Sequence, residues 1–470
     1  MYAFFEYVLW ELRNSFGIVF FTGIATLGTI AVTYTLYRRK YKGERKFPWA
    51  KALLWLILVG YAAVVIYVTL LRSGSGYRSW NLHLFRAWRE AWNNYSVKNW
   101  ANVLLNVAMF FPFGVLLPLI GDCFRKWYLT IATGLVMSVL IELIQLVAGI
   151  GICDVDDLFA NTLGTAIGFL PIMSILSIFN KKRGRGLKSC LIYSTWLLVI
   201  VVSIASIFTF YELKEYGNLP MASAYRNNTK NTTWFLDCKL PVVDSKLPVY
   251  RAKNRSLQDC DAFAEYMAEL DDTEVDMVSY YQDFAYYMLC AGGSGSGVLL
   301  VSYHDESYEY AVAGSRHDIA TVTSDRGTIE GALSKYPVFI PECAKFSVDQ
   351  NNWHVFTANH IVDGTVMFDG TLRCQYLEDG TLKKIENSLL TYNYYGEVSV
   401  ISPSEAYHAL CNGDFYDEGY FELQSPEKVK VLSCTLGYET DTKGFYRPVY
   451  VFEVKAEDGN YSDTIIIPAM

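Results

Sequence analysis

The chain has 470 residues, of which 52% are hydrophobic and 16% aromatic, and its formal net charge is −8. The charge is unevenly distributed, because residues 1–220 hold 21 Lys and Arg against 11 Asp and Glu, whereas the remainder holds 19 against 37. Basic residues cluster beside apolar runs and form no separate basic face, which disfavours nucleic-acid binding. The distribution predicts a membrane region followed by an acidic soluble region.

Six apolar runs follow an aromatic-rich interfacial segment at residues 1–15. Each run has about 20 residues, the length that crosses the hydrocarbon core of a bilayer. We place the runs at about residues 16–37, 49–71, 101–119, 127–150, 158–179 and 190–210, within a membrane domain over 16–210. Basic clusters follow the first, third and fifth runs, which predicts an N-terminus outside the cell. Residues 72–98 are rich in tryptophan and predict a helix in the headgroup layer.

Residues 211–233 are polar and predict a linker to an extracytoplasmic α+β domain at 234–470, for which two subdomains meeting near residue 370 are one option. Helical periodicity extends over 259–288, and short strand-like runs begin at 297. A hairpin is predicted over 372–385, and a helix is predicted to start at the Ser402 cap. The ten cysteines form no C-x-x-C pair, so we interpret them as small apolar side chains, and we expect no cofactor or metal.

Polar side chains interrupt three of the apolar runs at a similar depth. At about 1.5 Å per helical residue, Glu142 lies about 22 Å from Trp127, on a run that enters from the cytoplasm. A lone carboxylate in lipid costs at least about 2.5 kcal/mol, so Glu142 should be partnered or protonated. We therefore predict a ligand-binding polar pocket in the outer leaflet. Its candidate residues are Asn102, Asn106, Glu142, Gln145, Asp154, Asp156, Asp157 and Asn161.

The alternative interpretation is structural. Amides within a membrane also bond one helix to another, at about 0.6 kcal/mol each on average. For Asn102, Gln145 and Asn161, taken one by one, we favour this structural interpretation, whereas for Glu142 with Asp156 and Asp157 we favour a functional one. Gly164 and Gly168 form a small-xxx-small pair, which predicts close packing of the fifth run against a neighbouring helix.

Several short motifs resemble the VanZ-like family of bacterial membrane proteins. They are Asn102–Asn106, Phe111–Pro118, Glu142–Gln145, Asp154–Leu158 and Asn161–Gly164, and the resemblance covers about residues 50–180. It implies a link to low-level glycopeptide resistance of the teicoplanin type. The family often has an arginine shortly before the acidic motif, whereas residues 148–153 contain none. A weaker resemblance, over about 370–470, is to extracytoplasmic regulatory modules of the PepSY-like or YycI-like kind.

Three functions remain open from the sequence. The first is a non-enzymatic envelope protein that binds an amphiphile, an envelope precursor or a lipoglycopeptide in the polar pocket and docks an envelope partner through its soluble domain. The second is an intramembrane enzyme for a lipid-linked substrate, with Glu142 as acid or base and Asp156 and Asp157 holding a divalent cation. The third is a membrane-anchored sensor that acts through the soluble domain alone.

Overall fold

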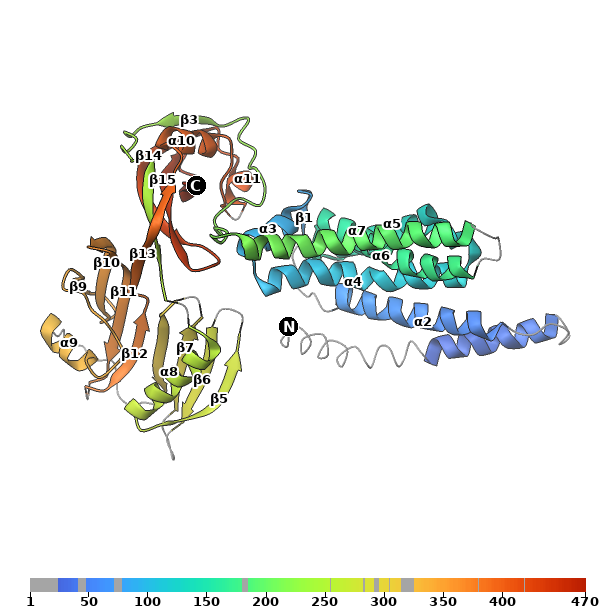
Figure 1. Cartoon of the computed structure of the whole chain (residues 1–470), viewed down its shortest axis with the longest axis horizontal. Coiled ribbons are helices and arrows are strands. Elements are labelled where there is room, and N and C mark those ends of the chain that lie inside the picture. Colours follow the sequence, from blue (N-terminus) through green and yellow to red (C-terminus); the bar gives the residue numbers. More distant parts are fainter. Residues whose placement is uncertain are drawn as a thin grey trace. The chain divides into compact units, whose positions relative to one another are not determined.

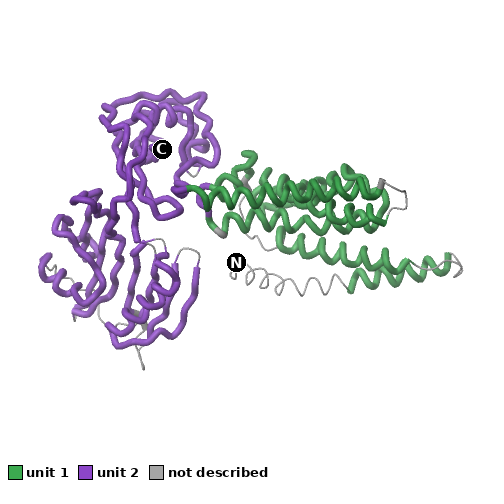
Figure 2. The backbone as a smooth tube through the Cα atoms, in the orientation of Figure 1, with its two compact units in different colours: residues 1–92, 96–214 green, residues 93–95, 215–470 purple. Residues whose placement is uncertain are grey.

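The computed structural model divides the chain into two compact units (Figure 2). Unit 1 comprises residues 1–92 and 96–214, and unit 2 comprises residues 93–95 and 215–470. The structure describes residues 24–40, 48–71, 78–179, 185–253, 255–281, 284–290, 296–303, 305–313, 325–378, 380–417 and 419–470. The predicted interfacial segment at 1–15 lies outside this described part of the chain.

Unit 1 is a helical bundle with one short two-stranded sheet (Figure 1). Residues 24–40 are helical. The later elements are α2 (Trp49–Ile66), a π-helical turn (Tyr67–Leu71), β1 (Arg78–Asn81), α3 (Arg86–Asn94), α4 (Val97–Ile120), a 3-10 turn (Asp122–Arg125), α5 (Trp127–Ala148), β2 (Gly151–Asp154), α6 (Val155–Ile178) and α7 (Arg185–Leu213).

Five helices in the described residues are long and apolar enough to cross a membrane. They are Trp49–Leu70, Lys98–Ile120, Trp127–Ala148, Val155–Ile178 and Gly186–Leu213. These helices coincide with the second to sixth predicted apolar runs. The first predicted run, 16–37, starts outside the described residues, and its described part is helical.

Glycines bring α4 and α6 into close contact, as the small-xxx-small pair predicted. A Cβ atom on Gly164 would clash with the carbonyl oxygen of Val107, and one on Gly168 would clash with that of Phe111. Both helices begin at the same end of unit 1, because Gly164 lies against Val107 and, one turn further along both helices, Gly168 lies against Phe111. Their first turns therefore lie beside each other.

The segment between the second and third predicted runs is more structured than a single interfacial helix. Its described part forms β1 and then the nine-residue helix α3. β1 pairs with β2 in the register Trp80↔Cys153 and Asn81↔Asp154. This pairing places β1 beside β2, the strand that ends at the first residue of the acidic motif.

Unit 2 is built on one 14-stranded sheet with small helices, so this half of the chain is α+β as predicted. The strand path is β3-β14-β15-β4-β13-β11-β12-β8-β7-β6-β5, with β10 on β11, β9 on β10 and β16 on β15. The strands are β3 (Thr233–Leu236), β4 (Lys246–Arg251), β5 (Glu274–Tyr280), β6 (Phe284–Cys290), β7 (Ser296–Ser302), β8 (Tyr308–Ala313), β9 (Lys345–Val348), β10 (His354–Asp363), β11 (Val366–Tyr376), β12 (Leu382–Asn387), β13 (Leu390–Ser399), β14 (Lys428–Thr440), β15 (Phe445–Ala456) and β16 (Ser462–Pro468). The helices are α8 (Leu257–Leu270), α9 (Arg326–Leu333), α10 (Pro403–Cys411) and α11 (Tyr420–Gln424).

Two clusters of buried side chains form most of the core of unit 2. One includes Met267, Tyr287 and Phe356, from α8, β6 and β10. The other includes Leu410 and Phe452, from α10 and β15. Each cluster fills the space between strands and the helices that cover them.

The helix predicted over 259–288 is wrong in its second half. α8 ends at Leu270, and residues 274–290 form the hairpin β5–β6. Along β6, Ala285, Tyr287 and Leu289 are buried and alternate with partly exposed neighbours, which is the period of a strand. The predicted hairpin at 372–385 and the helix capped by Ser402 are both present.

Residues 217–227, within the predicted linker, pack as part of unit 2. The backbone N–H of Gly217 donates to Asp441 at 2.7 Å, and the Asn227 side chain donates to the carbonyl of Phe415 at 2.7 Å. Asn218 and Asn227 are buried. This segment is therefore ordered by polar contacts with residues far away in sequence.

Candidate functional site

The acidic motif begins with Asp154, which joins three elements. Its carboxylate caps α6 by accepting from the backbone N–H of Asp156 at 2.8 Å. It also accepts from the side-chain amide of Asn81 on β1, at 3.0 and 3.2 Å to its two oxygens. A carboxylate at a helix N-terminus satisfies an otherwise unpaired N–H and interacts favourably with the helix dipole. The hydrogen bonds of Asp154 thus hold β1 against the start of α6.

Asp156 performs a similar role for α3. Its side chain is buried, with 2% of its surface exposed. One oxygen accepts from the backbone N–H of Phe85, and the other accepts from that of Ala87 at 2.7 Å. These N–H groups lie at the beginning of α3, so Asp156 fixes this helix to α6.

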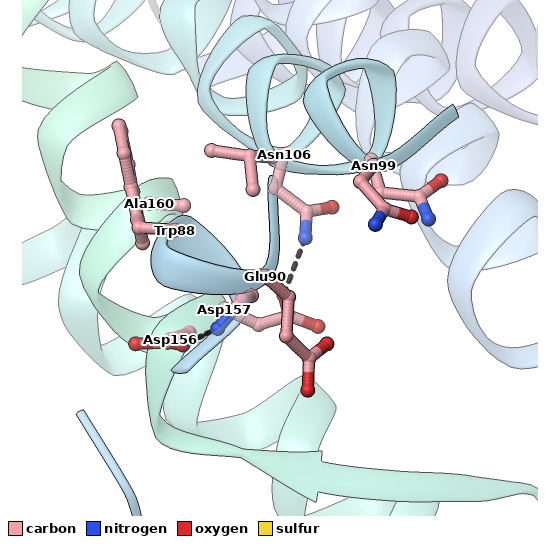
Figure 3. A pocket seen from close by; sticks show the side chains of 10 residues that line it. Trp88, Glu90, Asn99, Asn106, Asp156, Asp157 and Ala160 are labelled. Carbon is pink, nitrogen blue, oxygen red and sulfur yellow. Dashed lines mark hydrogen bonds between the residues drawn. The ribbon is translucent and has the colours of Figure 1, made fainter. Parts of the chain in front are cut away.

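Asp157 is the member of the motif with the fewest protein partners. One carboxylate oxygen accepts from the side-chain amide of Asn106 on α4, as the dashed line in Figure 3 shows. No donor among the described residues is recorded for its second oxygen, Oδ2. Asp157 therefore retains the capacity to accept a hydrogen bond from a ligand.

A polar cavity lies at this point, where α3, α4 and α6 meet (Figure 3). Its volume is about 80 Å³. Asn99, Asn102 and Asn106 line it from successive turns of α4, and Asp156 and Asp157 line it from α6. The other lining residues are Ala87, Trp88, Glu90, Val103 and Ala160.

Glu90 is the acidic contribution of α3 to this cavity. It forms an ion pair with Arg86 one turn earlier, with 2.8 Å between Nε and Oε1. The pair is partly exposed, so it contributes little to stability. The cavity thus offers mainly carboxylate and carboxamide oxygens as acceptors, together with the amide N–H donors of asparagine.

Four of the eight predicted site residues line this cavity, namely Asn102, Asn106, Asp156 and Asp157. Glu142 does not line it. Glu142 is buried on α5, and its Oε2 accepts from the backbone N–H of Asp154 at 2.9 Å. It therefore has a partner, as its position in the membrane requires, but that partner is a backbone group of β2.

Gln145 and Asn161 also lie away from the cavity. Gln145 donates to the carbonyl of Thr69 at 3.0 Å, and Asn161 donates to the hydroxyl of Ser138 at 2.9 Å. Each bond joins two elements of unit 1, as the structural interpretation of these amides expects. Their oxygens, Oε1 and Oδ1, are buried and have no hydrogen-bond partner within the described residues.

Four residues at or beside the site were not predicted from the sequence, namely Asn81, Trp88, Glu90 and Asn99. Asn99 could have been found, because it precedes Asn102 by one turn and Asn106 by two on the same face of α4. Asn81 and Glu90 gave no such signal. Their positions depend on the pairing of β1 with β2 and on the docking of α3.

The described residues contain no group of three or more His, Cys, Asp and Glu side chains that could hold a metal ion. The hydroxyl and thiol side chains of Ser, Thr, Tyr and Cys are likewise missing from the ten residues that line the cavity, all of which are described. The arrangement is suited to hydrogen bonding and to accepting positive charge.

Comparison with protein families gives a match to the VanZ/LLP1 model over residues 53–180. This part of the chain is similar to the VanZ-like family. The matched region contains α3, α4, α5 and α6 and therefore all ten residues that line the cavity. Together with the five apolar helices, it makes the protein a multi-pass membrane protein.

Among solved structures, one match to this chain is weak. The Bacillus megaterium YpeB C-terminal domain is 10% identical in sequence, covers 47% of this chain and 100% of its own, and superposes with a TM-score of 0.17. The comparison with curated proteins found no match.

Proposed function

We propose that this VanZ-like membrane protein of the bacterial cell envelope binds an amphiphile in the polar cavity. The observation that supports this most directly is the convergence of Asn102, Asn106 and Asp157 on one cavity, with an oxygen of Asp157 left to accept from a ligand. Polar side chains near lipid generally mark a functional site. Binding there contributes to glycopeptide resistance of the teicoplanin type or to envelope homeostasis.

The proposed topology has six spans, with the N-terminus and unit 2 on the extracytoplasmic side. Basic clusters after the first, third and fifth spans support it, since such clusters remain in the cytoplasm. In this topology the first turns of α4 and α6 face the outer leaflet, and the cavity opens to lipids and antibiotics that reach it from outside. Unit 2 then lies where it can dock an envelope partner.

Non-enzymatic binding fits the cavity better than catalysis. The enzyme hypothesis needs Glu142 beside Asp157 as acid or base. Glu142 is instead buried against the backbone of β2 and does not line the cavity. A general acid or base must reach the proton that it transfers.

The test compares cells that express the wild-type protein with cells that express Asn106→Ala or Asp157→Ala. The matched control is Asn94→Ala, because Asn94 is exposed on α3 and does not line the cavity. We expect both cavity variants to increase susceptibility to lipoglycopeptides while their abundance in the membrane stays at the wild-type level. Wild-type susceptibility in both variants at equal abundance would refute the proposal.

A further inference from the structure

An apolar groove lies beside the polar cavity in unit 1. It has a volume of about 550 Å³. Trp88 and Trp92 line it from α3, Trp100 lines it from α4, and Ile207 and Phe210 line it from α7. Pockets for small molecules have volumes of about 300–1,000 Å³, so this groove can take a hydrocarbon chain.

Trp88 lines both the groove and the polar cavity. Of the next two residues of α3, Arg89 lines the groove and Glu90 lines the cavity. The two spaces are thus adjacent along one helix. An amphiphile needs such a pair of spaces, one polar and small and the other apolar and larger.

Two residues that line the groove carry unpaired hydrogen-bond donors. The indole N–H groups of Trp88 and Trp100 are buried and have no acceptor within the described part of the chain. Trp100 is 8% exposed. An unpaired buried donor costs about 1–3 kcal/mol, and an oxygen of a bound amphiphile reaches these two nitrogens only if the tryptophan side chains move, because both nitrogens are closed to solvent.

The charge of the cavity selects among headgroups. Glu90, Asp156 and Asp157 are acidic, and the ten lining residues, all described, include no Lys, Arg or His. A phosphate or carboxylate placed there would be repelled, whereas an ammonium group would be attracted and could donate to Asp157 Oδ2. The volume of about 80 Å³ corresponds to about five to eight water-sized spheres, which is enough for an ammonium group.

We propose that the ligand is an amphiphile with a primary ammonium head in the polar cavity and an acyl chain in the apolar groove. This inference rests on the proposed function and narrows its ligand class. Two sources share this chemistry, namely an aminophospholipid of the membrane and an acylated antibiotic that carries a free amine.

The experiment uses the purified full-length protein in phosphatidylcholine nanodiscs. A dodecylammonium probe with a photoreactive group on its chain is cross-linked, and the labelled peptides are identified by mass spectrometry. We expect labelling around Ile207 and Phe210, and about tenfold less labelling by an anionic probe, dodecyl phosphate, of the same chain length, which corresponds to about 1.4 kcal/mol.

Two variants separate the head from the chain. Asp157→Asn removes the charge that attracts the head, and Ile207→Trp fills the groove. Each is expected to reduce ammonium-probe labelling by about tenfold. Leu198→Trp is the matched control, because Leu198 is 62% exposed on the same helix and does not line the groove. Competition by phosphatidylethanolamine or by an acylated aminoglycopeptide then distinguishes the two sources, and competition by neither would overturn the ligand class.

The outcomes separate this inference from the proposed function. If resistance in cells depends on Asp157 but both probes label the wild type equally, the ammonium amphiphile is overturned and the binding function stands. If neither resistance nor labelling depends on Asp157, both are overturned. Loss of ammonium-probe labelling in Asp157→Asn and Ile207→Trp, with wild-type labelling in Leu198→Trp, supports the two-part site.

Discussion

Asp156 provides the sharpest test of how the acidic motif works. Its buried carboxylate accepts from the backbone N–H groups of Phe85 and Ala87, and these two bonds attach the beginning of α3 to α6. In Asp156→Ala both N–H groups lose their acceptor in a place that water reaches poorly. We predict that α3 then separates from the bundle while the long membrane helices remain folded.

The magnitude follows from the two lost bonds. An unsatisfied buried donor costs about 1–3 kcal/mol, so two cost about 2–6 kcal/mol. If the substitution acts only as the loss of a helix cap, the destabilisation of α3 is smaller, at about 0.5–2 kcal/mol. α3 has nine residues, and isolated helices shorter than about 12–15 residues are marginal in water. The helix therefore has little stability of its own to offset this loss.

Hydrogen–deuterium exchange of the full-length protein in nanodiscs measures the effect. We expect backbone amides of residues 85–94 to exchange at least about tenfold faster in Asp156→Ala, since about 1.4 kcal/mol corresponds to a factor of ten. Asp156→Asn keeps one acceptor oxygen and should lie between the wild type and the alanine variant. Asp122→Ala is the control, because the Asp122 side chain is 80% exposed in its pair with Arg125. Unchanged exchange over 85–94 in Asp156→Ala would refute this account of the motif.

Three further predictions concern packing, ion pairing and protonation. Gly164→Leu should reduce the amount of folded protein, because a side chain there clashes with the carbonyl of Val107 and overpacking costs about 1–3 kcal/mol; an unchanged melting profile in detergent would contradict it. Asp441→Ala should destabilise unit 2 by about 3–5 kcal/mol, measured by urea unfolding, because it leaves the 7%-exposed Arg447 without its ion pair at 3.6 Å; a change below about 1 kcal/mol would show that the pair is dispensable. Burial lowers the pKa of His354, so the unfolded chain is protonated at a higher pH than the folded chain and stability is lost as pH falls below about 6.5. His354→Phe should make the melting temperature of unit 2 less dependent on pH between about 7 and 5, and an equally steep decline in the variant would argue against this origin.

The membrane helices could be predicted from the sequence because their signal is local. An apolar run long enough to cross a bilayer is visible without any knowledge of its neighbours. The prediction of a helix was wrong for the second half of 259–288, because the structure there depends on contacts with distant residues. The residues Phe284–Cys290 are apolar at almost every position, and a short apolar run of this kind fits a buried strand as well as a helix segment. The hairpin β5–β6 is decided by its pairing with β7, which is a tertiary property.

The sequence indicated which polar residues lie near the site, but it did not indicate which of them line the cavity and which bond other elements of unit 1. Depth in the membrane placed Asn106 and Asp157 at one level, and in the structure their side chains are hydrogen-bonded. Depth also grouped Glu142 and Asn161 with them. Depth along a helix does not fix the direction of a side chain around it. Ser138 and the backbone of Asp154, which bind these two side chains, lie on faces that do not reach the cavity.

The acidic motif therefore combines two kinds of residue that a functional screen must separate. The carboxylate oxygens of Asp154 and Asp156 accept hydrogen bonds from the amide of Asn81 and from backbone N–H groups. Glu142 on α5 likewise accepts from a backbone N–H group. Neutral donors stabilise these carboxylates, so no arginine next to the motif is needed to hold it together. Loss of activity in an Asp154 or Asp156 variant would follow from the release of β1 or α3 and would say little about the ligand. Asp157 has one side-chain partner and an oxygen left over, so a ligand should be sought through it.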